Sequence, residues 1–262
     1  MASKPSILLI PGSFSHASMY YPLQDAIQAL GYECFVNNAP SASRNPPEEP
    51  ATLEDDAVFF RGIIEKLADQ GKDVVVVPHS YGGIIATEAA KGASKADRQA
   101  SGKPGGIVKI IYLTAIVLPE GGSSRKDYGE PPAALVHVGE DGFMRITGVE
   151  LCAQATFNDW PYEKALEITK TMTRHSAPSF AGILTYPAYK HIPCSYIFCE
   201  HDMIIPPEKQ QHYIDQIKEG SRKEVEVHKL LTGHCPTVTA TNETAKVIVD
   251  MASSHKQSAT LK

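Results

Sequence analysis

Short apolar runs alternate with longer amphipathic segments along most of the chain. The runs are rich in Val, Ile and Leu and end at glycine, proline or charged residues, as is typical of strands buried on both faces of a sheet. The predicted strands cover residues 6–10, 32–36, 73–77, 107–113, 194–199 and 224–230. Strands of this kind separated by helices predict the α/β class, with a mostly parallel central sheet flanked by helices on both faces.

The segment 52–70 shows the helical periodicity most clearly, with acidic residues in its first turn. Its predicted apolar face is formed by Val58, Ile63, Ile64 and Leu67. Further helices are predicted at residues 17–30, 84–90, 207–217 and 239–253.

The alternation stops between residues 119 and 190, where no strand of the central sheet is evident and a helix is expected over 162–174. Ligands of open α/β sheets bind at the carboxyl ends of the strands. We therefore predict a core formed by residues 1–118 and 191–262, and a lid, residues 119–190, packed over that edge.

Composition narrows the class of protein. The 262 residues carry a net charge of −5, with 21% charged residues, which favours neither nucleic-acid nor membrane binding. The start of the chain shows no apolar leader and its tail no anchor motif, and no apolar run reaches the ~20 residues that span a bilayer. The five cysteines form no C-x-x-C pair, which indicates free thiols in a reducing compartment. We expect a cytoplasmic protein, and a homodimer is compatible with the sequence.

The most informative motif follows the third predicted strand. His79-Ser80-Tyr81-Gly82-Gly83 leads directly from a run of four valines into a helix. A serine at a sharp strand-to-helix turn is exposed as a nucleophile, and the amides at the start of the helix can stabilise an oxyanion. The usual form of this nucleophile elbow is G-x-S-x-G, and Pro78 stands here in place of the first glycine.

A serine nucleophile needs a base and an acid that orients the base. Asp202 follows the strand predicted at 194–199, and His234 lies in a glycine-bearing loop after the strand predicted at 224–230. The order Ser80, Asp202, His234, each after a strand, predicts a catalytic triad.

The exit of the first strand, Pro11-Gly12-Ser13-Phe14, is the predicted oxyanion loop. One amide would come from Ser13 and the other from Tyr81, while Gly12 would let the backbone approach the substrate. No histidine pair has zinc-ligand spacing and no phosphate loop is present, so neither a metal nor a cofactor is expected. Predicted substrate contacts are Gly12, Phe14, His16, Phe143, Phe157 and Trp160.

Through these motifs the chain resembles the α/β-hydrolase superfamily over nearly its whole length. The pattern is most similar to the small-lid branch that includes methyl-salicylate-type esterases and hydroxynitrile lyases, in a form associated with fungal members. The resemblance implies the α/β-hydrolase fold with a helical lid, and the triad Ser80, Asp202 and His234. Pro11, where the family usually has histidine, and Pro78 depart from the pattern.

The leading hypothesis is a serine hydrolase that cleaves a small to medium carboxylic ester or lactone through an acyl-enzyme. One alternative is a lyase, or an enzyme that cleaves or rearranges C–C bonds, on the same triad. Related hydroxynitrile lyases place a lysine directly after the base, and Cys235 occupies that position here. The other alternative is a slow-turnover ligand receptor that retains the triad.

Overall fold

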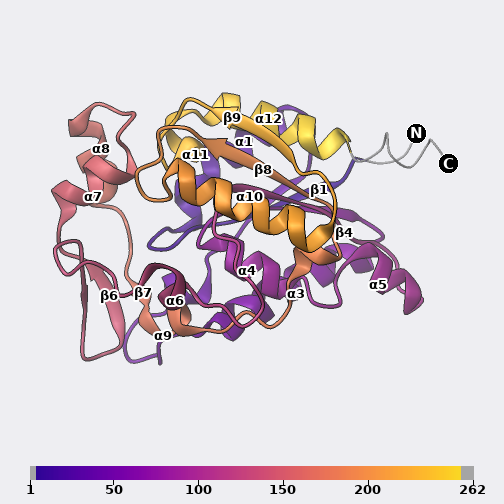
Figure 1. Ribbon diagram of the computed structural model, residues 1–262, viewed down its shortest axis with the longest axis horizontal. Coiled ribbons are helices and arrows are strands. Elements are labelled where there is room, and N and C mark those ends of the chain that lie inside the picture. The colour runs from indigo at the N-terminus through magenta and orange to yellow at the C-terminus, as the bar shows by residue number, and fades with distance from the viewer. Residues whose placement is uncertain (1–3, 255–262) are drawn as a thin grey trace.

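The computed structural model describes residues 4–254, so both ends of the predicted core, with the expected absence of a leader and an anchor, lie outside the described residues. A six-stranded parallel sheet runs through the molecule in the order β2-β1-β3-β4-β8-β9 (Figure 1). Its strands are β1 (Ser6–Ile10), β2 (Cys34–Val36), β3 (Asp73–Ser80), β4 (Gly106–Ala115), β8 (Cys194–Cys199) and β9 (Glu226–Leu230). The predicted α/β-hydrolase architecture is confirmed.

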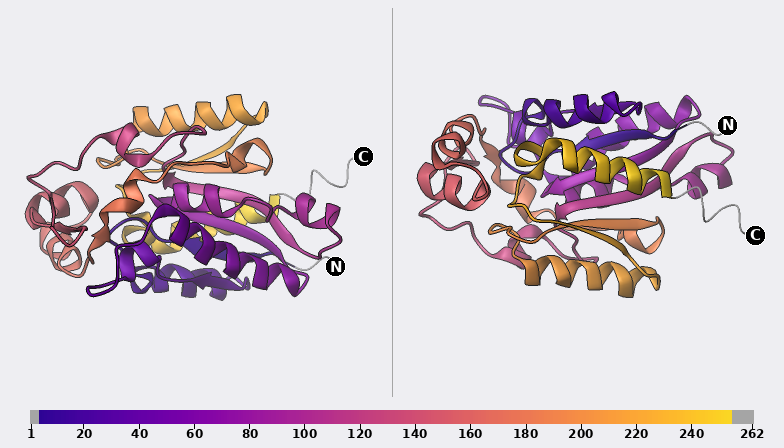
Figure 2. Two further views of the ribbon diagram at one scale, coloured as in Figure 1. Left: turned by 90° about the horizontal axis from the view of Figure 1, so that it is seen from below. Right: turned by 90° about the horizontal axis from the view of Figure 1, so that it is seen from above.

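Helices cover both faces of this sheet (Figure 2). Alternate residues of each strand face opposite layers: Ile7 and Leu9 pack with α1 and α12, whereas Leu8 and Ile10 pack with α3, α4 and α10. The helices of the core are η1 (Ala17–Tyr20), α1 (Tyr21–Ala29), α2 (Pro40–Ser43), α3 (Leu53–Asp69), α4 (Gly82–Ala89), α5 (Lys95–Ala100), α10 (Pro207–Ser221), α11 (Pro236–Thr239) and α12 (Thr241–Ser254).

Helix α3 begins with a capping box between Thr52 and Asp55, as its acidic first turn suggests. Its buried face was predicted wrongly at one position, because Val58 is 53% exposed. Phe60 occupies the core on that face instead, together with Ile64 and Leu67.

The edge strand β9 also differs from the expectation of strands buried on both faces. Four of its five residues are exposed, and only Leu230 is buried. β9 is the last strand in the order of the sheet, and charged, exposed side chains on such an edge strand discourage pairing with another strand. Lys229 pairs there with Glu200.

The middle of the segment 119–190, from β5 to α8 (residues 136–169), lies at one end of the molecule, beside the carboxyl ends of the sheet strands, and its last residues run back to the amino end of β8 (Figure 2). The sequence showed no strand of the central sheet in this segment, and none of its strands belongs to that sheet. The segment does contain three short strands, which form a separate antiparallel sheet in the order β5-β6-β7. Its elements are α6 (Ser124–Tyr128), β5 (Val136–Val138), β6 (Phe143–Ile146), α7 (Val149–Thr156), α8 (Tyr162–Thr169), β7 (His175–Ser176), α9 (Ala177–Ala181) and η2 (Ala188–Lys190). Among residues 4–254, no helix is long and apolar enough to cross a bilayer.

Candidate active site

Ser80 is the last residue of β3 and has a left-handed backbone, with φ of 54°. A non-glycine residue in this region is strained, and such strain persists where the surroundings impose it. Gly82 and Gly83 permit the turn, because added Cβ atoms there would lie 2.5 Å from the Ile10 oxygen and 2.3 Å from the Ile116 oxygen. The strand extends through Pro78, beyond the predicted end at residue 77.

Ser80, His234 and Asp202 form a hydrogen-bonded series. His234 Nε2 lies 3.0 Å from Ser80 Oγ, and His234 Nδ1 lies 2.7 Å from Asp202 Oδ2. Ser80 ends β3, whereas His234 and Asp202 lie in the loops after β9 and β8, and the carboxyl ends of these strands meet at the same edge of the sheet. All three are buried, so water competes weakly for these hydrogen bonds.

The Asp202 carboxylate accepts hydrogen bonds on both oxygens. Oδ2 also accepts from the Thr114 hydroxyl, and Oδ1 accepts from the amides of Ile204 and Ile205 at 2.7 and 2.9 Å. Burial opposes ionisation of Asp202, but the neighbouring His234 and these hydrogen bonds outweigh it and lower its pKa below the ordinary value of 3.8. The carboxylate is therefore held as an anion in the orientation that His234 needs.

The two amides predicted to form the oxyanion hole belong to Tyr81, which follows Ser80 in the chain, and to Ser13, which lines the same cavity as Ser80. Tyr81 directly precedes α4, and Ser13 follows Gly12 at the exit of β1. Among the described turn and loop contacts, neither amide donates to a protein acceptor. An added Cβ atom at Gly12 would lie 3.0 Å from Ser80 Cβ, so glycine keeps this space open.

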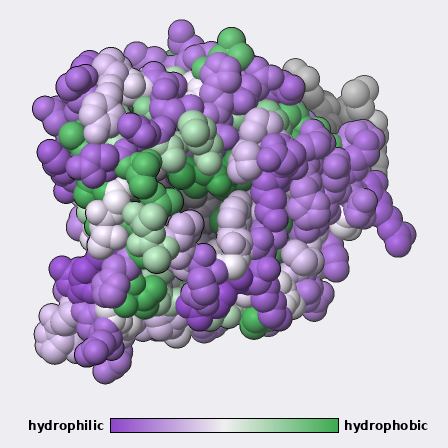
Figure 3. Space-filling view, turned by 60° about the vertical axis from the view of Figure 1, so that its left-hand side comes forward, coloured by the Kyte–Doolittle hydropathy of each residue, from purple (hydrophilic) through white to green (hydrophobic). Residues whose placement is uncertain are grey.

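A cavity of about 140 Å³ opens onto Ser80 and His234. Figure 3 shows apolar side chains gathered around a hollow on the face that carries the 119–190 segment. Among the residues that the structure describes, no Asp, Glu, Lys or Arg side chain lines the cavity, whose wall is formed by Gly12, Ser13, Phe14, Ser15, His79, Ser80, Leu135, Val136, Ile146, Cys152, Thr156, Met172, Ile204, His234 and Cys235.

Gly12 and Phe14 are the predicted contacts that line this cavity. The other four do not line it in the part of the chain that the structure describes. His16 is exposed before η1, Phe143 is buried in β6, and Phe157 and Trp160 pack between α7 and α8. The aromatic side chains Phe157 and Trp160 hold the helices of the 119–190 segment together, and the segment contributes Leu135, Val136, Ile146, Cys152, Thr156 and Met172 to the wall.

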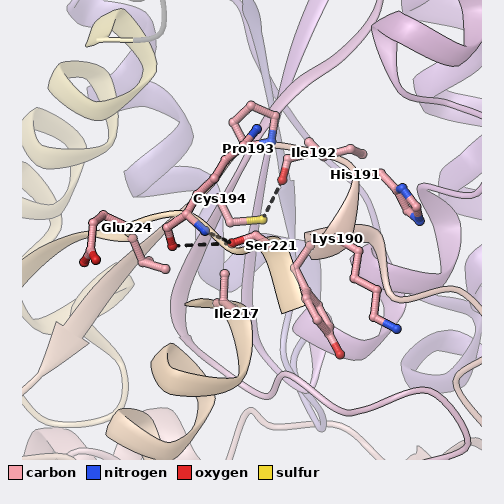
Figure 4. Close-up of a pocket in the computed structure, with 11 residues that line it drawn as sticks. Lys190, His191, Ile192, Pro193, Cys194, Ile217, Ser221 and Glu224 are labelled. Carbon is pink, nitrogen blue, oxygen red and sulfur yellow. Dashed lines mark hydrogen bonds between the residues drawn. The ribbon is translucent and has the colours of Figure 1, made fainter. Parts of the chain in front are cut away.

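A smaller hollow of about 80 Å³ lies at the opposite end of β8 (Figure 4). Cys194 begins the strand there, and its thiol donates to the Ile192 oxygen over 3.2 Å. Asp202 follows the other end of β8, so this hollow is separate from the Ser80 cluster.

Comparison with known proteins agrees with this geometry. A sequence model of the α/β hydrolase family matches residues 7–247. The chain belongs to the α/β hydrolase family. This α/β hydrolase is 36% identical over 250 residues to "Probable hydrolase R7" of Phoma sp., covering 95% of this chain and 99% of that protein. It is 27% identical over 251 residues to "Alpha/beta hydrolase nvfD" of Aspergillus novofumigatus, covering 95% and 97%.

Solved structures share the fold of this α/β hydrolase. The crystal structure of polyneuridine aldehyde esterase superposes with a TM-score of 0.73 at 19% identity, covering 95% of this chain and all of that one. The sequence relative of that name, from Rauvolfia serpentina, is 22% identical over 273 residues.

Sequence reasoning missed contacts that the 119–190 segment of the hydrolase makes with the site. Asp159 accepts from the Gly233 amide at 2.9 Å, and Asn158 donates to the His201 oxygen at 2.9 Å. The Tyr81 hydroxyl donates to the Ser179 oxygen at 3.0 Å. Polar residues beside Trp160 were the only sequence signal for the first two contacts.

Proposed function

We propose that this α/β hydrolase is a serine hydrolase that cleaves small to medium, uncharged carboxylic esters or lactones. The observation that carries the proposal is the hydrogen-bonded series Ser80–His234–Asp202 at the mouth of an apolar cavity. The segment 119–190 would act as the lid of this site.

The hydrogen bonds support one direction of proton transfer. The Asp202 carboxylate only accepts, so His234 Nδ1 carries the proton and Nε2 is free to take the proton of Ser80. Ser80 Oγ would attack the ester carbonyl, and the amides of Ser13 and Tyr81 would hold the oxyanion. Each such donor is typically worth ~2.7–4 kcal/mol of barrier.

The proposed reaction has two steps, formation and hydrolysis of the acyl-enzyme, and in each step His234 takes up one proton and gives it back. Collapse of the tetrahedral intermediate breaks the bond to the alcohol oxygen, which takes the proton from His234 Nε2. Water then loses a proton to the same nitrogen and attacks the acyl-enzyme. The second collapse returns that proton to Ser80 and releases the acid.

The cavity supports the size and polarity of the substrate. Its volume of about 140 Å³ is close to that of an engineered cavity of ~150 Å³ that binds benzene. One side of the ester would therefore be no larger than a single ring or a short chain. An ionised group would lose its hydration against Leu135, Ile146 and Met172 without a counter-charge.

The test is hydrolysis of p-nitrophenyl acetate and butyrate, followed to steady state with wild type, Ser80→Ala and Ser18→Ala. Ser18 is exposed outside the site and serves as the matched control. We expect steady turnover in wild type and Ser18→Ala, and none above background in Ser80→Ala. Retained turnover in Ser80→Ala would refute the mechanism, and a burst without turnover in wild type would favour the slow receptor.

A further inference from the structure

A chain of hydrogen bonds runs behind Ser80 through two buried side chains, Tyr20 and His79. The Gly12 amide donates to the Tyr20 hydroxyl oxygen at 2.9 Å. That oxygen lies 2.7 Å from His79 Nδ1, and His79 Nε2 lies 2.7 Å from the backbone oxygen of His234. Both side chains are 3% exposed. These hydrogen bonds thus connect the loop after β1, the end of β3 and the loop after β9.

The chemistry of the groups fixes the direction of each hydrogen bond. A carbonyl oxygen only accepts, so His79 Nε2 must carry the proton that is donated to His234. Burial lowers the pKa of His79 to about 3, and the ring is therefore neutral near pH 7. Its Nδ1 then accepts from the Tyr20 hydroxyl, whose oxygen in turn accepts from Gly12.

We infer that Tyr20 and His79 are positioning residues that align the oxyanion loop, the nucleophile and the base with one another. The inference rests on the proposed function. Gly12 directly precedes Ser13, His79 directly precedes Ser80, and the last acceptor belongs to His234 itself. Each end of this series of hydrogen bonds is thus no more than one residue from a group that would act on the substrate.

This placement also concerns charge. The rings of His79 and His234 have centroids 4.9 Å apart, and His234 would become an imidazolium during the reaction. A neutral ring fixed as the Nε2–H tautomer adds no repulsion to that cation. A side chain at position 20 without a hydroxyl would leave His79 Nδ1 without its donor. The His79 ring could then turn, and its hydrogen bond to the backbone oxygen of His234 would be lost.

The test compares Tyr20→Phe with Tyr21→Phe. Both changes remove one hydroxyl, but Tyr21 is 51% exposed and makes none of the hydrogen bonds that join Gly12, Tyr20, His79 and His234. The readouts are the rate at which a fluorophosphonate probe labels Ser80, and kcat and KM for p-nitrophenyl butyrate. Because a displacement of ~1 Å can cost about 100-fold in rate, we expect labelling and kcat to fall about 10- to 100-fold in Tyr20→Phe. KM should change less than about threefold, and Tyr21→Phe should behave as wild type.

A second pair of variants separates positioning from a general loss of structure. His79→Asn retains an acceptor for Tyr20 but lacks the ring donor to His234, and we expect a loss similar to that of Tyr20→Phe. The double variant should lose no more than the worse single variant, because either change breaks the same chain. Circular dichroism confirms that each variant is folded at the assay temperature.

Wild-type labelling and kcat in folded Tyr20→Phe would overturn the inference, and so would losses that multiply in the double variant. A wild type that labels at Ser80 without turning over esters would refute the proposed function, while the labelling rates would still test the chain. A wild type that does not label would overturn both.

Discussion

Replacing Thr114 by valine tests how the site holds its acid. Thr114 is fully buried near the end of β4, and its hydroxyl donates to Asp202 Oδ2, the same oxygen that faces His234. Its backbone φ of 34° is strained for a β-branched residue. Valine keeps the branched shape and removes only the donor, so Asp202 would retain the His234 contact and the amides of Ile204 and Ile205.

The expected cost follows from the charge on the acceptor. A hydrogen bond to a charged group contributes about 1.5–3 kcal/mol, so the free energy of unfolding of Thr114→Val should fall by about this amount at pH 7. At about 2–4 °C per kcal/mol in a chain of this size, the melting temperature should fall by roughly 3–12 °C.

The difference should depend on pH with a definite sign. The pKa of Asp202 is lower in the folded protein than its ordinary value of 3.8. A group of this kind contributes its stability above the unfolded pKa and loses it as the pH falls through the folded pKa. The difference in free energy of unfolding between wild type and Thr114→Val should therefore be largest near pH 7 and become smaller at low pH as Asp202 becomes protonated.

Thermal unfolding followed by circular dichroism measures this difference, with Thr114→Ser as the control that keeps a hydroxyl. Combining Thr114→Val with Asp202→Asn gives a double-mutant cycle, in which we expect a coupling energy of at least ~1 kcal/mol. Effects of the two changes that add within ~0.5 kcal/mol would refute the reasoning, as would a melting temperature of Thr114→Val equal to that of wild type.

Two further changes examine the cavity and the proposed lid. Ile204→Trp should fill part of the 140 Å³ cavity and lower kcat/KM for p-nitrophenyl butyrate at least about 10-fold more than for the acetate, and equal losses would argue against an acyl site there. Asp159→Ala should lower the free energy of unfolding by about 1 kcal/mol and reduce kcat, because the buried Gly233 amide beside His234 loses its acceptor. Asp159→Asn, which keeps an acceptor oxygen, should stay close to wild type in both assays.

The central sheet and the positions of Ser80, Asp202 and His234 could be predicted because both depend on local patterns. An apolar run such as residues 194–199 identifies a buried strand by itself, and β8 has these bounds in the structure. Parallel strands bring their carboxyl ends to one edge, so polar residues directly after three such runs are expected to meet there. Their hydrogen bonds at 2.7 and 3.0 Å agree with that reasoning.

The 119–190 segment could not be predicted in the same way, because its sheet is built from very short strands, one of which, β7, is separated from the other two by α7 and α8. Phe143 of β6 pairs with Ser176 of β7, and Val136 of β5 pairs with Ile146. Strands of two to four residues leave no recognisable alternation. The aromatic residues of the segment suggested substrate contacts, but Phe157 and Trp160 pack inside the segment and do not line the cavity among the described residues.

The contacts by which some residues hold others in place could likewise not be read from a local motif, even for His79, which belongs to the motif around Ser80. Thr114 acts on Asp202 across 88 positions of sequence, and His79 reaches the His234 backbone across 155. A reaction mechanism specifies a nucleophile, a base and an acid, and so directs the search for them. It does not specify which buried hydroxyl or ring will satisfy their remaining hydrogen-bonding atoms, since that depends on which strand ends become neighbours.

Pro78 shows how a departure from a motif can preserve its physical purpose. The elbow requires α4 to lie close to β1 and β4, and the first glycine of the usual motif was expected to permit this approach. Here Gly82 and Gly83 provide it, since side chains at these positions would collide with the backbone oxygens of Ile10 and Ile116. Proline at position 78 can then remain within β3, where it pairs in register with Ile10, while the strand continues to Ser80. The requirement of the fold is the close approach of these backbones, and at this elbow glycines on the helix side allow it while proline stands on the strand side.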